Sequence, residues 1–242
     1  MLSANTSVST LTATLAFANI SDIAKIDQFY GPLLKALNAT TGVTPQYRCI
    51  PFPSIVSFIP SIPITGNADE TGTISIIGSR LFSRDLLVSD DGPARLISAF
   101  SSLQYRPGQP LIGHIVAGGV VAKNAHTIDS ALNPAWRKTL LHAVIRRNWS
   151  PNATVQEQKA VRENLTNVEL LILQSVEGLG IMGAYLNEAD ADERNFQESF
   201  WGANYPRLYD IKQKWDPLGL FNARKTAGSE YWDEGGLCPV QI

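Results

Sequence analysis

The chain has 242 residues, of which 44% are hydrophobic and 17% are charged, and its formal net charge is −2 at pH 7. This composition is typical of a globular protein, and the length allows one large core or two small ones. The small negative charge argues against nucleic acid as a partner, because no basic surface would hold phosphates. No apolar run is long enough to span a membrane.

The first third of the chain alternates between extended and helical patterns. Residues 10–17 alternate in the manner of a strand. Ser21 is expected to cap a helix, which the glycine–proline pair at 31–32 should break or kink. Residues 40–58 are expected to be extended, with prolines that confine any strand to an edge. Residues 60–72 predict a loop, because they are rich in proline, glycine and asparagine.

The middle of the chain predicts two strands with a helix between them. Residues 73–81 are rich in isoleucine and predict the first strand. A helix should follow Ser89, with one apolar face formed by Leu96, Ile97, Phe100 and Leu103. Residues 110–121 form the most strand-like segment, although a pair of glycines at 118–119 indicates a bulge or a close approach of another group. Residues 136–149 fit either a strand or a helix.

A long helix is predicted from Val155 to about Gln174, with Thr154 as its N-cap. Its apolar residues at helical spacing are Val161, Leu165, Val168 and Ile172. Strands are interleaved with helices but show no regular βαβ alternation. The sequence therefore predicts an α+β fold, in which helices cover one face of an antiparallel sheet. No repeat, low-complexity tract or linker divides the chain.

The segment after this helix has the character of a site. Three glycines between residues 178 and 183 precede three polar side chains, those of Tyr185, Asn187 and Glu188. If the segment is extended, Tyr185 and Asn187 share one face and Glu188 points to the other. Polar groups this close together behind glycines indicate a functional site rather than a solvated strand.

A last helix is predicted from the spacing of Leu208, Ile211 and Trp215, which places them on one stripe facing the core. Asp216 and Pro217 should end this helix, because proline lacks an N–H group and restricts the residue before it.

At these residues the chain resembles a known family. The motifs are Tyr185-Leu-Asn-Glu188, Phe200-Trp-Gly-Ala-Asn-Tyr-Pro-Arg-Leu208, Lys212-x-Lys-Trp-Asp-Pro-x-Gly-Leu-Phe221, Asn133-Pro-Ala-Trp-Arg137 and Gly228-Ser-Glu-Tyr-Trp232. They resemble the C-terminal part of the berberine-bridge-enzyme-like flavoproteins of the vanillyl-alcohol-oxidase superfamily, and most closely the fungal FAD-linked oxidoreductases. The resemblance is clearest over residues 110–235.

The resemblance implies an α+β substrate-binding domain over residues 1–182 and a C-terminal segment, residues 183–242, that returns to the flavin. The implied cofactor is FAD. The family attaches its flavin in a glycine-rich N-terminal region, and this sequence contains no such region. We therefore expect an FAD domain upstream or in trans, and a small molecule as substrate. The resemblance also favours a strand over residues 136–149.

The resemblance assigns roles around the polar segment. Tyr185 and Asn187 would lie beside the isoalloxazine ring, and Glu188 stands where several members carry their catalytic base, commonly a tyrosine. A buried carboxylate with a raised pKa can also accept a substrate proton while hydride leaves to the flavin. The alternative for Glu188 is an ion pair with Arg194 or Arg207.

Two further residues have a functional and a structural interpretation. Asn204 would face the cofactor, or it caps the helix that follows. Arg137 would bind a polar group of the substrate, or it stacks on Trp136. Arg207 is expected to pair with a carboxylate.

Two functions fit these residues. The first is an FAD-dependent oxidoreductase, represented by its substrate-domain portion. The second is a non-catalytic remnant or small-molecule binding domain that has lost flavin binding. No spacing of cysteine and histidine suits a metal, so no metal site is expected, and His114, His126 and His142 are each expected to be structural or surface residues.

The chain also carries signs of a secreted origin. It has six N-glycosylation sequons where chance would give about two, at Asn5, Asn19, Asn38, Asn148, Asn152 and Asn164. The first residues do not form a signal peptide, so we expect Met1 to be an internal start or a truncation within a longer secreted protein. Cys49 and Cys238 form one disulfide in an oxidising compartment, or they are two free thiols.

Overall fold

The structure is a computed structural model that describes residues 2–5, 10–17, 20, 22–61, 74–104, 109–178 and 180–240. Contacts between residues divide the chain into two compact units. The first unit combines Met1–Thr14 with Ile74–Ile242, and the second is Leu15–Thr73. The boundary expected after residue 182 stays a prediction. Cys49 and Cys238 are free thiols in the structure and belong to different units, so the alternative of a disulfide between them stays untested.

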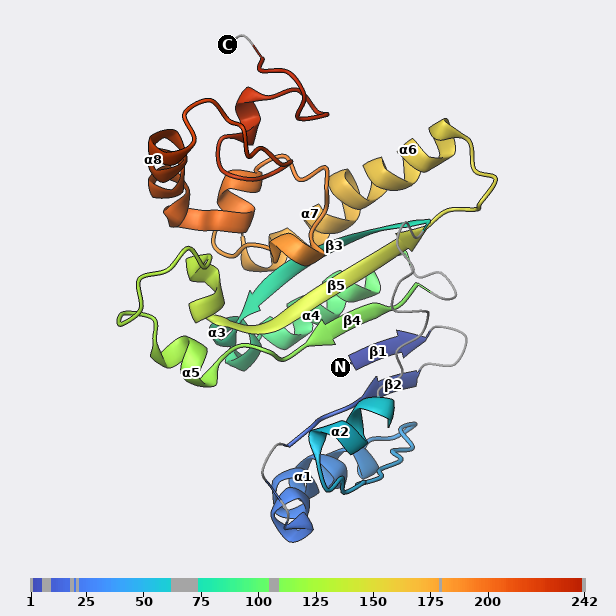
Figure 1. The fold of residues 1–242 in the computed structure, drawn as a ribbon. Helices are drawn as coiled ribbons and strands as arrows, with labels where there is room; N and C mark the ends of the chain where they lie inside the picture. The colour runs from blue at the N-terminus through green and yellow to red at the C-terminus, as the bar shows by residue number, and fades with distance from the viewer. Residues whose placement is uncertain are drawn as a thin grey trace. The chain divides into compact units, whose positions relative to one another are not determined.

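The first unit is built on an antiparallel five-stranded sheet (Figure 1). Its strand order is β2-β1-β4-β5-β3, and its strands are β1 (Leu2–Asn5), β2 (Thr10–Ala13), β3 (Ser75–Ser83), β4 (Leu111–His114) and β5 (Thr139–Asn148). The longest ladder joins β3 to β5. The strands predicted over residues 73–81 and 136–149 are thus confirmed, and the strand predicted over residues 10–17 is shorter than expected.

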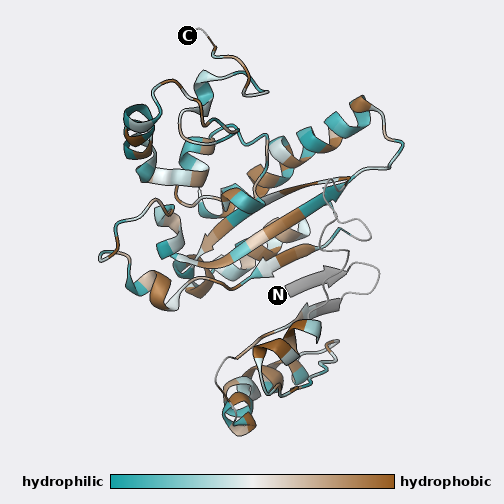
Figure 2. Ribbon diagram, viewed as in Figure 1, coloured by the Kyte–Doolittle hydropathy of each residue, from teal (hydrophilic) through white to brown (hydrophobic). Residues whose placement is uncertain are grey.

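Helices pack on one face of this sheet, as the sequence predicted. Leu141, Ala143 and Ile145 alternate along β5 and join the main hydrophobic core. The helices that contribute to this core are α3 (Arg84–Val88), α4 (Gly92–Ser101) and α7 (Leu170–Glu177). Figure 2 shows hydrophobic residues along β3, β4 and β5. Ile97 is 64% exposed, so its expected place on the buried face of α4 is wrong.

The long helix predicted after Thr154 is present but is not uniformly α-helical. It consists of α6 (Val155–Asn164), a π-helical turn (Leu165–Glu169) and α7. The Thr154 side chain forms a capping box with Glu157, which confirms the predicted N-cap. Within the π turn, Glu169 is 1% exposed and accepts hydrogen bonds of 2.8 and 2.6 Å from Arg147 of β5. This pair joins the helix to the sheet.

The segment after β4 departs from the prediction. The strand expected over residues 110–121 ends at His114, and Gly119–Lys123 forms the short helix α5. Gly118 and Gly119 have φ values of 86° and 45°. β4 has already ended at His114, so the glycines lie after this strand, at the start of α5, and form no bulge within it. A Cβ atom at either glycine would meet nothing within 4 Å, so no group of the described chain approaches them closely.

The last part of the first unit is mainly helical. It contains a second π turn (Gln197–Trp201), two 3₁₀ turns (Gly202–Asn204 and Ser229–Tyr231) and the predicted helix, α8 (Tyr205–Trp215). The direction predicted for the apolar stripe of α8 is wrong, because Ile211 is 44% and Trp215 77% exposed. The packed face of α8 is instead formed by Tyr205, Tyr209 and Lys212. The Tyr205 hydroxyl donates to Glu230, and the Tyr209 ring stacks on Tyr231. Lys212 forms an ion pair with Asp216 at the end of the helix.

The second unit contains α1 (Ile23–Asn38), α2 (Ile55–Phe58) and a 3₁₀ turn (Ile59–Ser61). Asp22 caps α1, whereas Ser21 lies outside the described residues. The loop predicted over residues 60–72 begins within the 3₁₀ turn, and its residues 62–72 also lie outside the described part. Of the break or kink predicted at residues 31–32, the break is wrong, since α1 continues through Pro32. Gly31 has no Cβ atom to clash with the proline ring, which removes one steric obstacle to a helical residue before proline.

Residues 40–54 form no strand in the structure, so the extended region expected before α2 is irregular chain. Edge-to-face aromatic rings give this unit its apolar centre, with Tyr30 buried against Phe17 and Phe29. Among the helices that the structure describes, none is long and apolar enough to cross a membrane.

Candidate functional site

The polar segment is anchored to β3 through its backbone. Leu81 N–H donates to the Gly183 carbonyl at 2.9 Å, and Ala184 N–H donates to the Ser199 carbonyl at 2.7 Å. A Cβ atom at Gly183 would lie 2.3 Å from the Ser199 carbonyl oxygen, so only glycine fits between these two chains. The segment therefore begins from a fixed position.

The chain then turns tightly instead of remaining extended. Leu186–Glu188 forms a 3₁₀ turn, and Glu188 N–H donates to the Tyr185 carbonyl at 2.9 Å. The condition of an extended segment therefore does not hold over these three residues. The side chains of Tyr185 and Asn187 nevertheless lie together, because the Asn187 amide donates to the Tyr185 hydroxyl at 2.7 Å.

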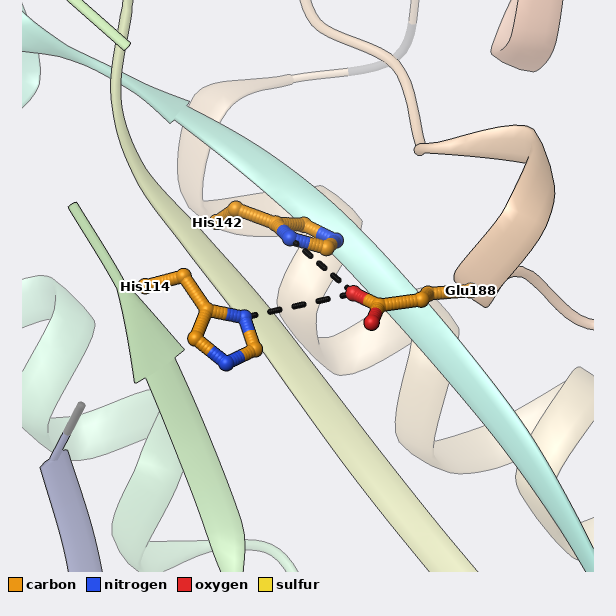
Figure 3. A group of neighbouring side chains, drawn as sticks. All are labelled: His114, His142 and Glu188. Atoms are coloured by element: carbon orange, nitrogen blue, oxygen red, sulfur yellow. Dashed lines mark ion pairs between the residues drawn. The ribbon is translucent and has the colours of Figure 1, made fainter. Parts of the chain in front are cut away.

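The turn brings Glu188 to two histidines on the sheet (Figure 3). His114 of β4 and His142 of β5 lie directly opposite each other in the antiparallel ladder. The Glu188 Oε2 atom is 3.9 Å from Nδ1 of His114 and 3.5 Å from Nδ1 of His142. His142 alternates with Leu141 and Ala143 along β5, so the three side chains meet on the sheet face opposite the hydrophobic core.

The ring of His142 is held by aromatic neighbours. Its centroid lies 5.7 Å from those of Trp136, Tyr185 and His114. Burial, with a smaller contribution from His114, lowers the pKa of His142 to about 4, so this imidazole is neutral at neutral pH. Its Nε2 atom is buried and has no hydrogen-bond partner among the residues that the structure describes.

The arginines named as alternative partners of Glu188 do not pair with it in the structure. Arg207 donates to both carboxylate oxygens of Asp129 at 2.7 Å, which confirms its expected pairing with a carboxylate. For Arg194 the described residues show no ion pair with Glu188, whose nearest titratable neighbours are the two histidines. The carboxylate of Glu188 is thus left beside imidazole rings.

The side chains of Asn204 and Arg137 donate hydrogen bonds to backbone carbonyls of neighbouring loops and helices. Asn204 precedes α8, but its side chain makes no capping bond and donates instead to the carbonyls of Ser130 and Leu132. Arg137 donates to the Val121 carbonyl at 2.9 Å. The ring of Trp136 packs against His142 and Tyr185. The cofactor and substrate roles expected for Asn204 and Arg137 stay predictions.

The sequence reasoning missed His114, His142 and Trp136 as members of this site. A signal was present, because both histidines lie in segments with strand-like alternation. What the sequence did not show was the pairing of β4 with β5, which places the two histidines opposite each other. These two histidines, which are distant in the sequence, therefore lie side by side in the fold.

Comparison with known proteins relates the site segment to one family. The family model described as berberine and berberine like matches residues 184–226, which include Tyr185, Asn187, Glu188 and Asn204. An uncharacterized FAD-linked oxidoreductase of Arthroderma benhamiae is 45% identical over 232 residues, which are 96% of this chain and 39% of that protein. The flavin-dependent oxygenase ucdF of Aspergillus ustus is 35% identical over 95% of this chain and 40% of its own length.

Solved structures show the same relationship. The VAO-type flavoprotein MtVAO713 from Myceliophthora thermophila C1 superposes with a TM-score of 0.70 at 25% identity, over 88% of this chain and 36% of that protein. The carbohydrate oxidase from Microdochium nivale shares the fold, with a TM-score of 0.60 at 17% identity. This chain thus spans about two fifths of the length of its relatives. The chain belongs to the berberine-bridge-enzyme-like members of the vanillyl-alcohol-oxidase superfamily.

Proposed function

We propose that this chain is the substrate-domain portion of an FAD-dependent oxidoreductase, and that Glu188 accepts the proton of a small organic substrate. The observation that carries the proposal is the position of Glu188. Its carboxylate lies on the sheet face opposite the hydrophobic core and does not pair with an arginine of the described chain. The names of the relatives, FAD-linked oxidoreductases and a flavin-dependent oxygenase, support the redox class.

The surroundings of Glu188 suit a proton acceptor. Its side chain is 38% exposed, so a substrate can reach it. Its distances to the two histidines exceed those of a hydrogen bond, so its lone pairs remain available on this side. A neutral His142 places no full positive charge beside the carboxylate, which would otherwise reduce its basicity.

The residues on this face fit a flavin. The exposed Asn187 amide and the half-buried Tyr185 ring offer a polar group and a flat surface, and the buried Nε2 atom of His142 still lacks a partner in the described chain. We assign Tyr185 and Asn187 to the cofactor side. The Oδ1 atom of Asn204, which has no partner among the described residues, is assigned there too. Bound FAD would accept a hydride from the substrate.

The proton-acceptor role is tested with Glu188→Gln in the enzyme assembled with an FAD domain. The amide keeps the shape of the side chain but cannot take up the proton. Because a positioned base contributes about 10²–10⁴-fold, anaerobic flavin reduction followed by stopped flow should slow by that factor at saturating substrate. Glu163→Gln, an exposed glutamate on α6, is the control and should leave the rate unchanged. A Glu188→Gln rate close to that of the parent would remove Glu188 from this role.

The need for an FAD domain is tested by titrating the 242-residue chain with FAD and recording the visible spectrum. We expect weak binding, or none, because the sequence holds no glycine-rich attachment region. Adding an FAD domain in trans, or fusing it upstream, should give a yellow complex that substrate bleaches. A yellow complex that no substrate reduces would favour the alternative of a non-catalytic binding domain. Stoichiometric FAD binding by the chain alone would refute the need for a partner domain.

A further inference from the structure

We propose that His114, His142 and Glu188 form a binding site for a divalent transition-metal cation of the zinc type. The cluster combines two imidazole nitrogens with one carboxylate oxygen, and these ligand atoms all lie within 4.8 Å of one another. Imidazole and carboxylate are the ligands that zinc binds in three-ligand protein sites with a further open position. The inference goes beyond the proposed function and gives the same carboxylate a second use, because a Glu188 oxygen that binds a cation cannot accept a substrate proton at the same time.

The distances distinguish a cation site from a hydrogen-bonded cluster. A hydrogen bond between imidazole and carboxylate requires about 2.7–3.2 Å, whereas the two histidine–glutamate distances are 3.5 and 3.9 Å. Ligand atoms around a tetrahedral zinc ion, each about 2.0–2.1 Å from the metal, lie about 3.3 Å from one another. The two histidine–glutamate distances are therefore too long for a hydrogen bond and within about 0.6 Å of the separation that one bridging cation needs.

The fold fixes two of the ligands and leaves the third adjustable. His114 and His142 are directly opposite in the β4–β5 ladder, with ring centroids 5.7 Å apart. Aromatic contacts from Trp136 and Tyr185 hold the His142 ring. Glu188 extends from a 3₁₀ turn with a side chain that is 38% exposed, so it can move the few tenths of an ångström that coordination requires.

The surroundings set the expected affinity and the open coordination position. The side chain of His114 is 22% exposed, so solvent reaches the cluster and can supply a water ligand. The Nε2 atom of His142 has no hydrogen-bond partner in the described residues. A ligating histidine usually donates a hydrogen bond from its other ring nitrogen, and loss of that partner typically weakens metal binding about 10–100-fold. We therefore expect a Kd for Zn²⁺ on the order of micromolar.

The test is a titration of the 242-residue chain, free of any affinity tag and treated with chelator, with Zn²⁺ alone in a calorimeter. We expect one Zn²⁺ per chain, and a tetrahedral visible spectrum when Co²⁺ replaces Zn²⁺. His114→Gln and Glu188→Gln should each weaken binding at least about 10-fold, because each removes one of three ligands. His126→Gln is the matched control, since it removes an exposed histidine outside the cluster.

The test uses the two more exposed ligands, because His142→Gln alters a buried residue and would also change the stability of the fold. Each variant is first checked for an unchanged circular dichroism spectrum. Absence of Zn²⁺ binding by the parent would overturn the proposal. Equal affinity in the parent and in His114→Gln, or a loss in His126→Gln, would do the same, because the metal would then bind elsewhere. None of these outcomes involves FAD, so they leave the proposed oxidoreductase function to its own tests.

Discussion

The guanidinium of Arg80 donates two hydrogen bonds, of 2.9 and 3.1 Å, to the carboxylate of Glu193, and the two side chains are 6% and 8% exposed. The pair joins β3 to the chain that follows the candidate site. Ser199 adds a third hydrogen bond to the same carboxylate, at 3.0 Å. The polar segment from Gly183 to Glu193 is thus fixed at both ends. Backbone hydrogen bonds hold it at Gly183, and this ion pair holds it at Glu193.

Glu193→Gln should destabilise the protein strongly. The amide leaves the buried charge of Arg80 without a counter-ion, and breaking a buried pair in this way costs about 3–5 kcal/mol. Glu163→Gln breaks a pair with Lys159 whose side chains are 57–71% exposed, so its cost should stay below about 1 kcal/mol. Urea denaturation of both variants measures the difference. Equal stability of the two would mean that the Arg80–Glu193 pair does not fix this segment.

Trp215→Ala should have little effect on the stability of this chain. The side chain is 77% exposed, so its removal creates no cavity and should change the free energy of unfolding by about 0.5 kcal/mol or less. Phe82→Ala is the contrast, because Phe82 is fully buried in the main core and its truncation should cost about 3–5 kcal/mol. Thermal melts of the two variants separate these cases, and a large loss in Trp215→Ala would show that α8 packs through its apolar stripe after all.

Asp190 should make stability fall as pH rises through the mildly acidic range. Burial raises the pKa of this carboxyl above its ordinary 3.8, even though Thr166 and the backbone N–H of Asp192 donate to it. The folded state therefore binds the proton more tightly than the unfolded state, and stability decreases as pH rises from about 4 through the raised pKa. Asp190→Asn should remove this slope, measured by urea denaturation at a series of pH values.

Asp192 should make the stability of the protein depend on pH in the opposite direction. Hydrogen bonds of 2.8 and 2.7 Å from Arg162 lower the pKa of the Asp192 carboxyl. Its stabilisation is present above pH 3.8 and disappears as pH falls through the lowered pKa. Asp192→Asn should thus lower stability at neutral pH.

For Asp190, the contradicting result is a slope of unfolding free energy against pH that is the same in Asp190→Asn as in the parent. Asp190 would then not be the source of the pH dependence of stability in the acidic range.

Local patterns were enough to predict those elements whose character is decided within a few residues. The strands β3 and β5 follow from β-branched and alternating residues, and the start of α6 follows from the Thr154 capping box. The family motifs located the site segment, because Tyr185, Asn187 and Glu188 stand in a short run of sequence. The position of Glu188 in space required the 3₁₀ turn, which alternation alone does not reveal.

Features that depend on pairing between distant segments were not predictable. His114 and His142 meet because β4 pairs with β5 in one particular register, and a shift of β4 by one residue would turn the His114 ring to the other face of the sheet. The orientation of α8 was also decided at a distance, by Tyr231 and Glu230, which draw Tyr209 and Tyr205 to the packed side. Residues 15–73 form a separate unit although no linker composition marks their ends.

The π turn at Leu165–Glu169 gives the long helix one residue more than its length along the axis requires. Deleting one residue there would restore an uninterrupted α-helix and leave α7 in its present rotational phase, because a π turn accommodates one extra residue within an α-helix. Leu173, which is fully buried, would then keep its place in the core. The long helix therefore tolerates a one-residue gap at this turn, and a relative with such a gap should orient α7 in the same way.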